Sequence, residues 1–330
     1  MTIRKGMIAT ALAVALTAGA ASADAPVNMT LSGGNPGGLW SLLGAGIDRA
    51  AKEANPASVV TYQATGGGFA NIALLDRART DLGIVHDAEV QIALAGDEPF
   101  NAPVTNMMAI GYMYNWAPMH FFLRRDIAEE YGITSLADIA SSGAALRIGV
   151  NRPGNITANV ALGMLEAAGA TVEVIEGNGG TIVRAGANDQ ADLLRDGRID
   201  MVTNGVFVLH ASFRAIDENN EVVLLTIPDD AAQVANTAFG TTPFVIPGGT
   251  YRFQPDDIDT LALGAMLVTH DGADEEAIYT LTAALIEHID EVRTVHSAMN
   301  ALDRELFANQ AILPFHPGAE RALREAGLLQ

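Results

Sequence analysis

The chain has 330 residues, 49% of them hydrophobic, with 19 Lys and Arg against 39 Asp and Glu and a formal net charge of −20. This length suits either one large domain or two lobes that each bury a core. The acidity argues against nucleic acid or an anionic membrane surface as a partner, and the lack of cysteine excludes disulfides, thiolate catalysis and cysteine metal sites.

The first 23 residues have the features of a secretory signal peptide. Arg4 and Lys5 precede an apolar stretch over residues 7–16, and small residues from Ala21 to Ala23 supply a cleavage site. The apolar stretch is too short and too rich in alanine for a spanning helix. We therefore expect export to the periplasm with cleavage after Ala23; an uncleaved anchor is the alternative.

A glycine-rich loop follows the first predicted strand. Residues 27–31 alternate as a strand does, and apolar residues recur at helical spacing from Leu39 to Ala50. Between them lies the glycine-rich loop of residues 32–38. Glycine lets the backbone turn tightly and lets a ligand approach the N–H groups, while a helix N-terminus favours an anion. The loop therefore predicts either an anion site or a simple strand-to-helix turn.

The same strand–glycine–helix pattern occurs twice more, and this repetition favours the anion site. Residues 58–63 predict a strand that enters the glycine run 64–68, and residues 146–150 predict a strand that enters the loop 151–157. Ligands of parallel α/β sheets bind beyond the carboxyl ends of the strands. We expect the early loops and the middle loop to face each other across a cleft.

The remaining elements complete an alternation of strands and helices. Residues 81–85 predict a buried strand, with a helix opening at His86. The apolar, aromatic run 106–125 predicts two strands, broken at Ala117-Pro118, and the first passage between lobes. Further strands are predicted over residues 171–175, 199–203, 222–227, 239–246 and 260–268, and helices over residues 189–195 and from residue 275 onward.

This alternation predicts an α/β fold with parallel sheets and helices on both faces. The two extended, proline-containing runs predict a two-lobed protein that closes on its ligand by a hinge. We expect residues 24–118 to form the first part of lobe I, residues 119–245 to form lobe II, and residues 246–330 to return to lobe I.

Six motifs, in order along the chain, resemble those of the TAXI-type solute receptors of tripartite ATP-independent periplasmic (TRAP) transporters. The resemblance runs from about Met29 to Leu328. The motifs are the first glycine loop, Gln63-Ala64-Thr65-Gly66-Gly67 with Asn71, the strand region from Ala78 to Ala88, Asp196-Gly197-Arg198-Ile199-Asp200, Ile246-Pro247-Gly248-Gly249-Thr250-Tyr251, and Leu313-Pro314-Phe315-His316-Pro317-Gly318-Ala319.

The resemblance implies a two-lobed type II periplasmic binding protein fold with a ligand cleft between the lobes. It implies a receptor, not an enzyme, that captures a small anionic solute such as glutamate, glutamine or a 2-oxoglutarate-like dicarboxylate. The expected partner is a TRAP-type membrane permease. We expect a monomer with no cofactor and no metal.

The glycine loops and the resemblance together give the candidate ligand-binding residues. They are Asn35, Gly37, Leu39, Trp40, Gln63, Thr65, Gly67, Gly68, His86, Arg152, Asn155, Thr157 and Asn204. Arg152 either forks onto a ligand carboxylate or is a solvated loop arginine. Trp40 either walls the pocket or packs between sheet and helix, and His86 either donates to the ligand or only starts a helix.

This chain departs from the family pattern inside the predicted cleft. Leu39-Trp40 stands where the family tends to have two tyrosines, Gly68 stands in place of a serine, and His86 in place of a glutamine. Because hydroxyl groups are lost and bulk is gained, we expect a ligand that is smaller or less polar than glutamate.

Two other functions fit parts of the sequence. A periplasmic sensing subunit would have the same fold and cleft but a signalling partner. An exported enzyme is disfavoured, because the seven histidines are scattered and the chain has no His-Glu-x-x-His, no Gly-x-Ser-x-Gly and no Walker lysine after a glycine loop.

Overall fold

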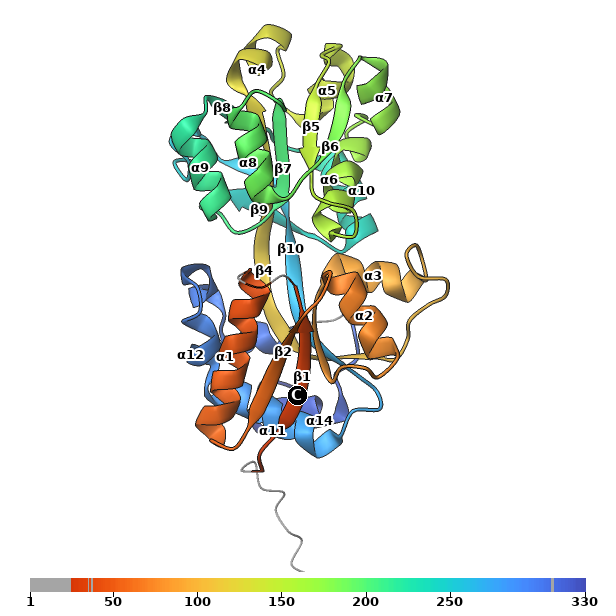
Figure 1. Cartoon of the computed structure of the whole chain (residues 1–330), viewed down its shortest axis with the longest axis vertical. Coiled ribbons are helices and arrows are strands. Elements are labelled where there is room, and N and C mark those ends of the chain that lie inside the picture. Colours follow the sequence, from red (N-terminus) through yellow and green to blue (C-terminus); the bar gives the residue numbers. More distant parts are fainter. Residues whose placement is uncertain (1–24, 35, 37, 310–311) are drawn as a thin grey trace, which may run out of the picture.

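The computed structural model describes residues 25–34, 36, 38–309 and 312–330 (Figure 1). The predicted signal peptide with its cleavage site, Asn35 and Gly37 lie outside the described residues. No helix among the described residues has the length and apolar character needed to cross a membrane.

The strands form a 10-stranded sheet in which two long strands connect two halves of the molecule. Its order is β2 (Val59–Ala64), β1 (Asn28–Gly33), β3 (Leu82–His86), β10 (Ile258–His270), β4 (Met107–Arg124), β7 (Met201–Gly205), β5 (Arg147–Val150) and β6 (Thr181–Arg184), with β8 (Val222–Leu224) beside β4 and β9 (Thr242–Ile246) beside β10. β1 runs parallel to β2 and β3, whereas β10 is inserted antiparallel between β3 and β4.

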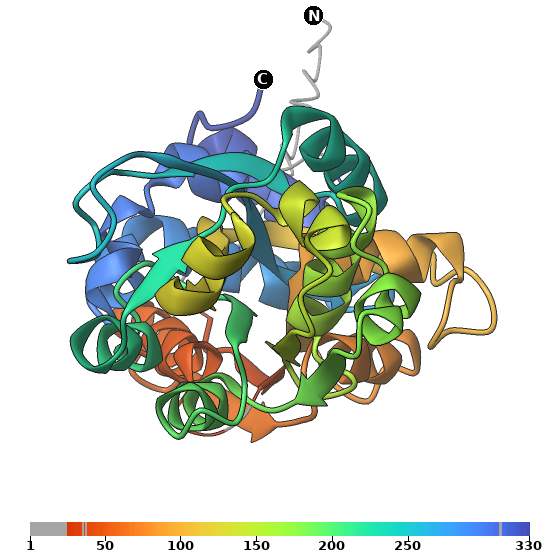
Figure 2. The ribbon, with the colours of Figure 1, turned by 90° about the horizontal axis from the view of Figure 1, so that it is seen from above.

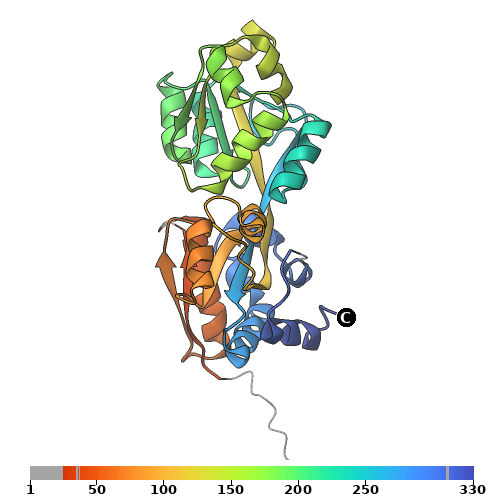
Figure 3. The ribbon, with the colours of Figure 1, turned by 90° about the vertical axis from the view of Figure 1, so that its right-hand side faces the viewer.

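β4 and β10 pass between two lobes, as Figures 1 and 3 show. β4 pairs with β10 as far as Pro118 and with β7 from Met119 onward. We call the half with β1 to β3 lobe I and the half with β5 to β8 lobe II. The partner exchange after Pro118 supports our proposed lobe boundary at residues 118–119; we also keep the return to lobe I after residue 245 as a proposal.

Helices cover the strands of both lobes, and they surround the sheet when the molecule is seen along its long axis (Figure 2). Lobe I carries α1 (Leu39–Ala54), α2 (Gly68–Asp76), α3 (Asp87–Ala95), α11 (Glu275–Glu287), α12 (Ile289–Arg293), the 3₁₀ helix η1 (Ser297–Ala301), α13 (Arg304–Ala308) and α14 (Pro317–Glu325). Lobe II carries α4 (Arg125–Tyr131), α5 (Leu136–Ser142), α6 (Ile156–Ala167), α7 (Val172–Gly177), α8 (Ala187–Arg195), α9 (Ala211–Asn219) and α10 (Asp229–Phe239).

Two predicted elements are wrong. The run 106–125 is one strand, β4, because Pro118 stands where the strand changes partners and a missing N–H costs least there. Residues 172–175 lie in α7 rather than in a strand. Thr171 caps this helix by accepting a hydrogen bond from Val174 N at 3.2 Å, and the local cap outweighs the β-branched alternation.

Candidate functional site

A cleft of about 600 Å³ lies between the lobes, and the three predicted loops line it. We call it the polar cleft. Nine of the predicted residues line it: Leu39, Trp40, Gly67, Gly68, His86, Arg152, Asn155, Thr157 and Asn204. Gln63 and Thr65 are not among its lining residues. The three loops therefore converge on one cleft, as the repeated pattern predicts. The side chains of Gln63 and Thr65 lie outside this cleft.

Thr65 stabilises the second glycine loop through hydrogen bonds and does not line the cleft. Its Oγ1 contacts the Gly33 carbonyl oxygen, lies 2.6 Å from Asn71 Oδ1 and accepts a hydrogen bond from Gly67 N at 3.1 Å. Gln63 is exposed near the end of β2, where it pairs with Ser32 of β1. The Gln63 side chain therefore reaches solvent rather than the cleft.

The wall of the polar cleft in lobe I is aromatic. Trp40 Nε1 donates a hydrogen bond to Tyr114 Oη at 3.1 Å, and the Trp40 and His86 rings lie 4.7 Å apart. Trp40 is 9% exposed and lines the cleft, so it both packs into the core and forms the wall. His86 starts α3 in a capping box with Glu89.

Glu89 was missed by the sequence reasoning, and it changes the character of this wall. Its Oε2 accepts a hydrogen bond from His86 N at 2.8 Å and lies 3.2 Å from His86 Nδ1. A Cβ on Gly68 would come within 1.6 Å of this oxygen. The carboxylate therefore occupies the N-terminus of α2, which we had expected to receive the ligand anion. The three-residue spacing from His86 was the available signal.

Asp87 lies beside this wall, fully buried at the start of α3. It accepts a hydrogen bond from Tyr112 Oη, while its Oδ1 has no partner within the described chain. Burial, only partly offset by the Tyr112 hydrogen bond, raises the pKa of Asp87 to about 6.

The wall in lobe II is a cluster of amides at the N-terminus of α6. Asn155 Oδ1 accepts a hydrogen bond from Thr157 N at 3.0 Å and caps the helix. Asn204 Oδ1 accepts from Asn151 Nδ2 at 3.3 Å and from Gly205 N at 3.1 Å. Asn204 Nδ2 is buried and has no hydrogen-bond partner among the described residues. A buried unpaired donor costs about 1–3 kcal/mol unless a ligand or a water accepts from it.

Arg152 lies at the rim of the polar cleft and already has a partner. Its Nη2 lies 2.6 Å from Asp189 Oδ2, and the two side chains are 67% and 54% exposed. An ion pair this exposed contributes about 0–1 kcal/mol. Its geometry favours a rim position over a sheltered fork onto the ligand.

A second cavity of about 640 Å³ adjoins the polar cleft. The two share Gly38, Leu39, Gly205, Val206 and His210. The second also has Leu42, Tyr114, Ala117, Phe207, Val208, Leu209, Ala211, Arg214, His296, Ser297 and Ala298 in its lining, and we call it the apolar compartment.

The loop between β7 and α9 shapes the apolar compartment and is tied to the hinge strand β4. Leu209 has a φ of 57°, a left-handed conformation unusual for a bulky residue. Its N–H donates to Tyr251 Oη at 3.2 Å, which lies 2.9 Å from His120 Nε2. His120 Nδ1 donates to the Pro118 carbonyl oxygen at 2.8 Å. Burial lowers the pKa of His120 to about 3, so the ring is neutral and Nε2 accepts from Tyr251.

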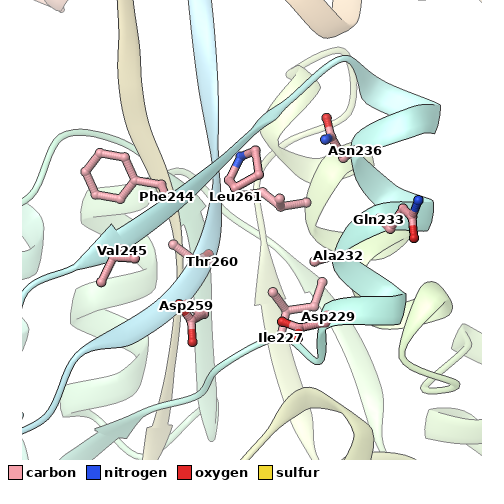
Figure 4. Close-up of a pocket in the computed structure, with 11 residues that line it drawn as sticks. Ile227, Asp229, Ala232, Gln233, Asn236, Phe244, Val245, Asp259, Thr260 and Leu261 are labelled. Atoms are coloured by element: carbon pink, nitrogen blue, oxygen red, sulfur yellow. The ribbon is translucent and has the colours of Figure 1, made fainter.

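A third cavity of about 360 Å³ lies away from the predicted loops (Figure 4). It is formed by α10 together with β9 and β10, and Ala232, Phe244 and Leu261 are among its lining residues. None of the predicted ligand-binding residues lines it.

Two lobes that share two long strands, with loops of both lobes facing one cleft, define the two-lobed fold of periplasmic binding proteins. The chain belongs to the NMT1-like family, whose model matches residues 31–327. It has this fold in common with MatC and PhnD1.

MatC from Rhodopseudomonas palustris, solved with bound malate, is 15% identical with a TM-score of 0.55, and the match covers 92% of this chain and 97% of MatC. PhnD1 from Prochlorococcus marinus, in complex with methylphosphonate, is 10% identical with a TM-score of 0.53, over 92% of this chain and 100% of PhnD1. A TctC solute binding protein from Polaromonas is 16% identical with a TM-score of 0.49, over 83% and 88% of the two chains.

Proposed function

We propose that this protein is a periplasmic receptor of the TAXI type. It binds a small carboxylate-bearing solute between its lobes and delivers it to a TRAP permease. The motifs of the sequence and the NMT1-like family support this function. This protein shares its fold with MatC, whose structure holds malate, a carboxylate. We further propose that the receptor is a monomer, without enzyme activity or a cofactor, and that export removes its first 23 residues.

The observation that carries the proposal is the free Nδ2 group of Asn204 in the polar cleft. The neighbouring amides fix the orientation of the Asn204 side chain, because its Oδ1 accepts the hydrogen bonds from Asn151 and Gly205. Nδ2 is left to donate to an oxygen of the solute. The N-terminus of α6 lies beside it and adds a favourable potential for an electron-rich oxygen of the solute.

A thermal-shift screen of residues 24–330 against carboxylates and amino acids tests the proposal. A ligand present at a hundred times its Kd should stabilise the folded protein by about 2.7 kcal/mol, which raises Tm measurably. If no carboxylate or amino acid raises Tm, the proposed ligand class is wrong.

Asn204→Asp gives a sharper test, because it keeps the size and the Oδ1 acceptor but replaces the donor by a negative oxygen. We expect the Kd of a carboxylate ligand to rise by at least about tenfold, which corresponds to about 1.4 kcal/mol. Asn178→Asp is the matched control, because Asn178 lies at the end of α7 and lines neither cavity. Equal binding by both variants would contradict the role of Asn204.

The transport partner is tested separately, because a sensing subunit would use the same cleft. Uptake of the identified solute by cells that express this protein with a neighbouring multi-spanning permease supports transport. If the solute instead triggers a cellular response that requires a neighbouring histidine kinase and no permease, the protein is a sensing subunit rather than a transport receptor.

A further inference from the structure

Three basic side chains from both lobes line the apolar compartment. His210 and Arg214 come from the start of α9 in lobe II, and His296 comes from the N-cap of η1 in lobe I. The three lie close enough together that the charges of His296 and Arg214 add to burial in lowering the pKa of His210. An anion bound among them would touch both lobes.

Each of the three groups has donors to offer. His210 Nδ1 lies 2.9 Å from Ser212 Oγ and accepts from Ser212 N at 3.4 Å, while His296 Nδ1 accepts from Ala298 N at 3.1 Å. Because Nδ1 accepts in both histidines, each ring has an N–H to offer on Nε2. Within the part of the chain that the structure describes, neither Nε2 has a hydrogen-bond partner and Arg214 forms no ion pair. Arg152, in contrast, is paired with Asp189.

The surroundings of this basic cluster are apolar. Leu42 and Leu209 are 38% and 45% exposed, which is unusual for large hydrophobic side chains, and both line the same compartment as Phe207. The strained backbone of Leu209 is held in place through Tyr251. Exposed apolar side chains and local strain concentrate at ligand-binding sites.

The polar cleft, unlike the basic cluster of the apolar compartment, is lined by acidic side chains. Glu89 and Asp189 both line the polar cleft, and the one guanidinium among its described lining residues, that of Arg152, is already paired with Asp189. A second carboxylate on the ligand would meet the negative charge of Glu89. The free donor of Asn204 Nδ2 suits a neutral acceptor such as a carbonyl oxygen.

We infer that the ligand carboxylate binds to Arg214, His210 and His296, and that the ligand is a monocarboxylate with an apolar body and a neutral acceptor group. Its body lies along Leu39 and Leu209, and its acceptor reaches Asn204. This inference rests on the proposed function and narrows its ligand class. It also makes Arg214, rather than Arg152, the arginine that recognises the carboxylate.

Calorimetry with matched probes on residues 24–330 tests the ligand class. Glutarate has a carboxylate at each end, 5-oxohexanoate replaces one of them by a methyl ketone, and 5-oxohexanamide removes the remaining charge. We expect 5-oxohexanoate to bind at least about tenfold more tightly than either of the other two. If glutarate binds as well as or better than 5-oxohexanoate, the inference is overturned while the proposed carboxylate receptor stands. If none of the three binds and the wider carboxylate screen is also negative, both fail.

Three arginine variants locate the carboxylate. Arg214→Gln should raise the Kd of 5-oxohexanoate by at least about tenfold, because a charge-assisted hydrogen bond is lost. Arg152→Gln should change it by less than about threefold, since that guanidinium is paired and exposed. Arg198→Gln is the control, an exposed arginine that lines neither cavity. If Arg214→Gln binds within about twofold of the wild type, or Arg152→Gln loses more than Arg214→Gln, the basic cluster is not the carboxylate site.

Discussion

Glu89 shows how a single residue can reverse the expected charge of a binding site. The glycines at the start of α2 predict an open anion site, but the Glu89 carboxylate lies against Gly68 and occupies it. A serine at position 68 would not fit beside this carboxylate. Gly68 and Glu89 therefore form a matched pair, because only glycine leaves room for the carboxylate.

Gly68→Ala should destabilise the fold because its Cβ would overlap the buried Glu89 carboxylate. We expect a loss of about 1–3 kcal/mol in the free energy of unfolding, measured by urea titration. Gly177→Ala is the matched control, since a Cβ there meets nothing within 4 Å. Combining Gly68→Ala with Glu89→Ala should recover most of the loss that Gly68→Ala causes. If Gly68→Ala is as stable as the control, the Glu89 carboxylate does not pack against Gly68.

At the scale of elements, β4 connects the site to the passage between the lobes. Its Pro118 carbonyl oxygen accepts from His120, and through Tyr251 the same chain of hydrogen bonds holds the loop that carries Leu209. The predicted motif from Ile246 to Tyr251 thus has a structural role, because its tyrosine fixes one wall of the apolar compartment.

This network should make the fold sensitive to acid. The pKa of His120 is about 3 when folded, below its ordinary 6.5, so the unfolded chain binds a proton that the folded chain does not. The contribution to stability is complete above pH 6.5 and is lost as the pH falls toward 3. We expect the free energy of unfolding to fall by up to about 1.4 kcal/mol per pH unit from this residue.

Urea titrations near pH 7 and near pH 5 measure the effect. The decrease between the two pH values should be smaller in His120→Gln than in the wild type, because glutamine does not titrate. The buried Asp87 also titrates in this range, with the opposite sign, but it does so equally in both proteins. An identical decrease in the two proteins would show that His120 is not a buried neutral histidine.

The elements were predictable where local signals decide them. The three glycine loops follow from strand alternation and turn residues, and nine of the residues predicted from the loops and the family resemblance line the polar cleft. The continuity of β4 was not predictable, because Pro118 is tolerated only through a partner exchange between distant strands. The same holds for His296 and Arg214, which the fold brings together from segments more than 80 positions apart in the sequence.

At the scale of the molecule, the site consists of residues from both lobes and is completed by their approach. Arg214 and His296 face the same compartment from lobe II and lobe I. A ligand that contacts both sides favours the closed arrangement by its differential affinity for it. We therefore expect binding and hinge motion to be coupled.

Small-angle scattering should detect this closure. We expect the radius of gyration to decrease when the ligand identified by calorimetry is added, because the lobes approach each other across the cleft. Arg214→Gln at the same ligand concentration should show a smaller decrease, and full closure should return when the ligand concentration is raised above its new Kd. An unchanged radius in a saturated wild-type sample would rule out a hinge motion of this kind.

The position of β10 also determines the order in which the chain can fold. β10 is inserted between β3 and β4 but begins at Ile258, long after both of its neighbours have been synthesised. Lobe I cannot complete its sheet until that segment arrives, so β3 and the first half of β4 expose unpaired edges to other chains in the meantime. Lobe II depends on no residue of β10 for its own β4–β7–β5–β6 pairing. Its sheet can therefore assemble first, and the interval before β10 joins lobe I is the period in which a newly synthesised molecule is most exposed to aggregation.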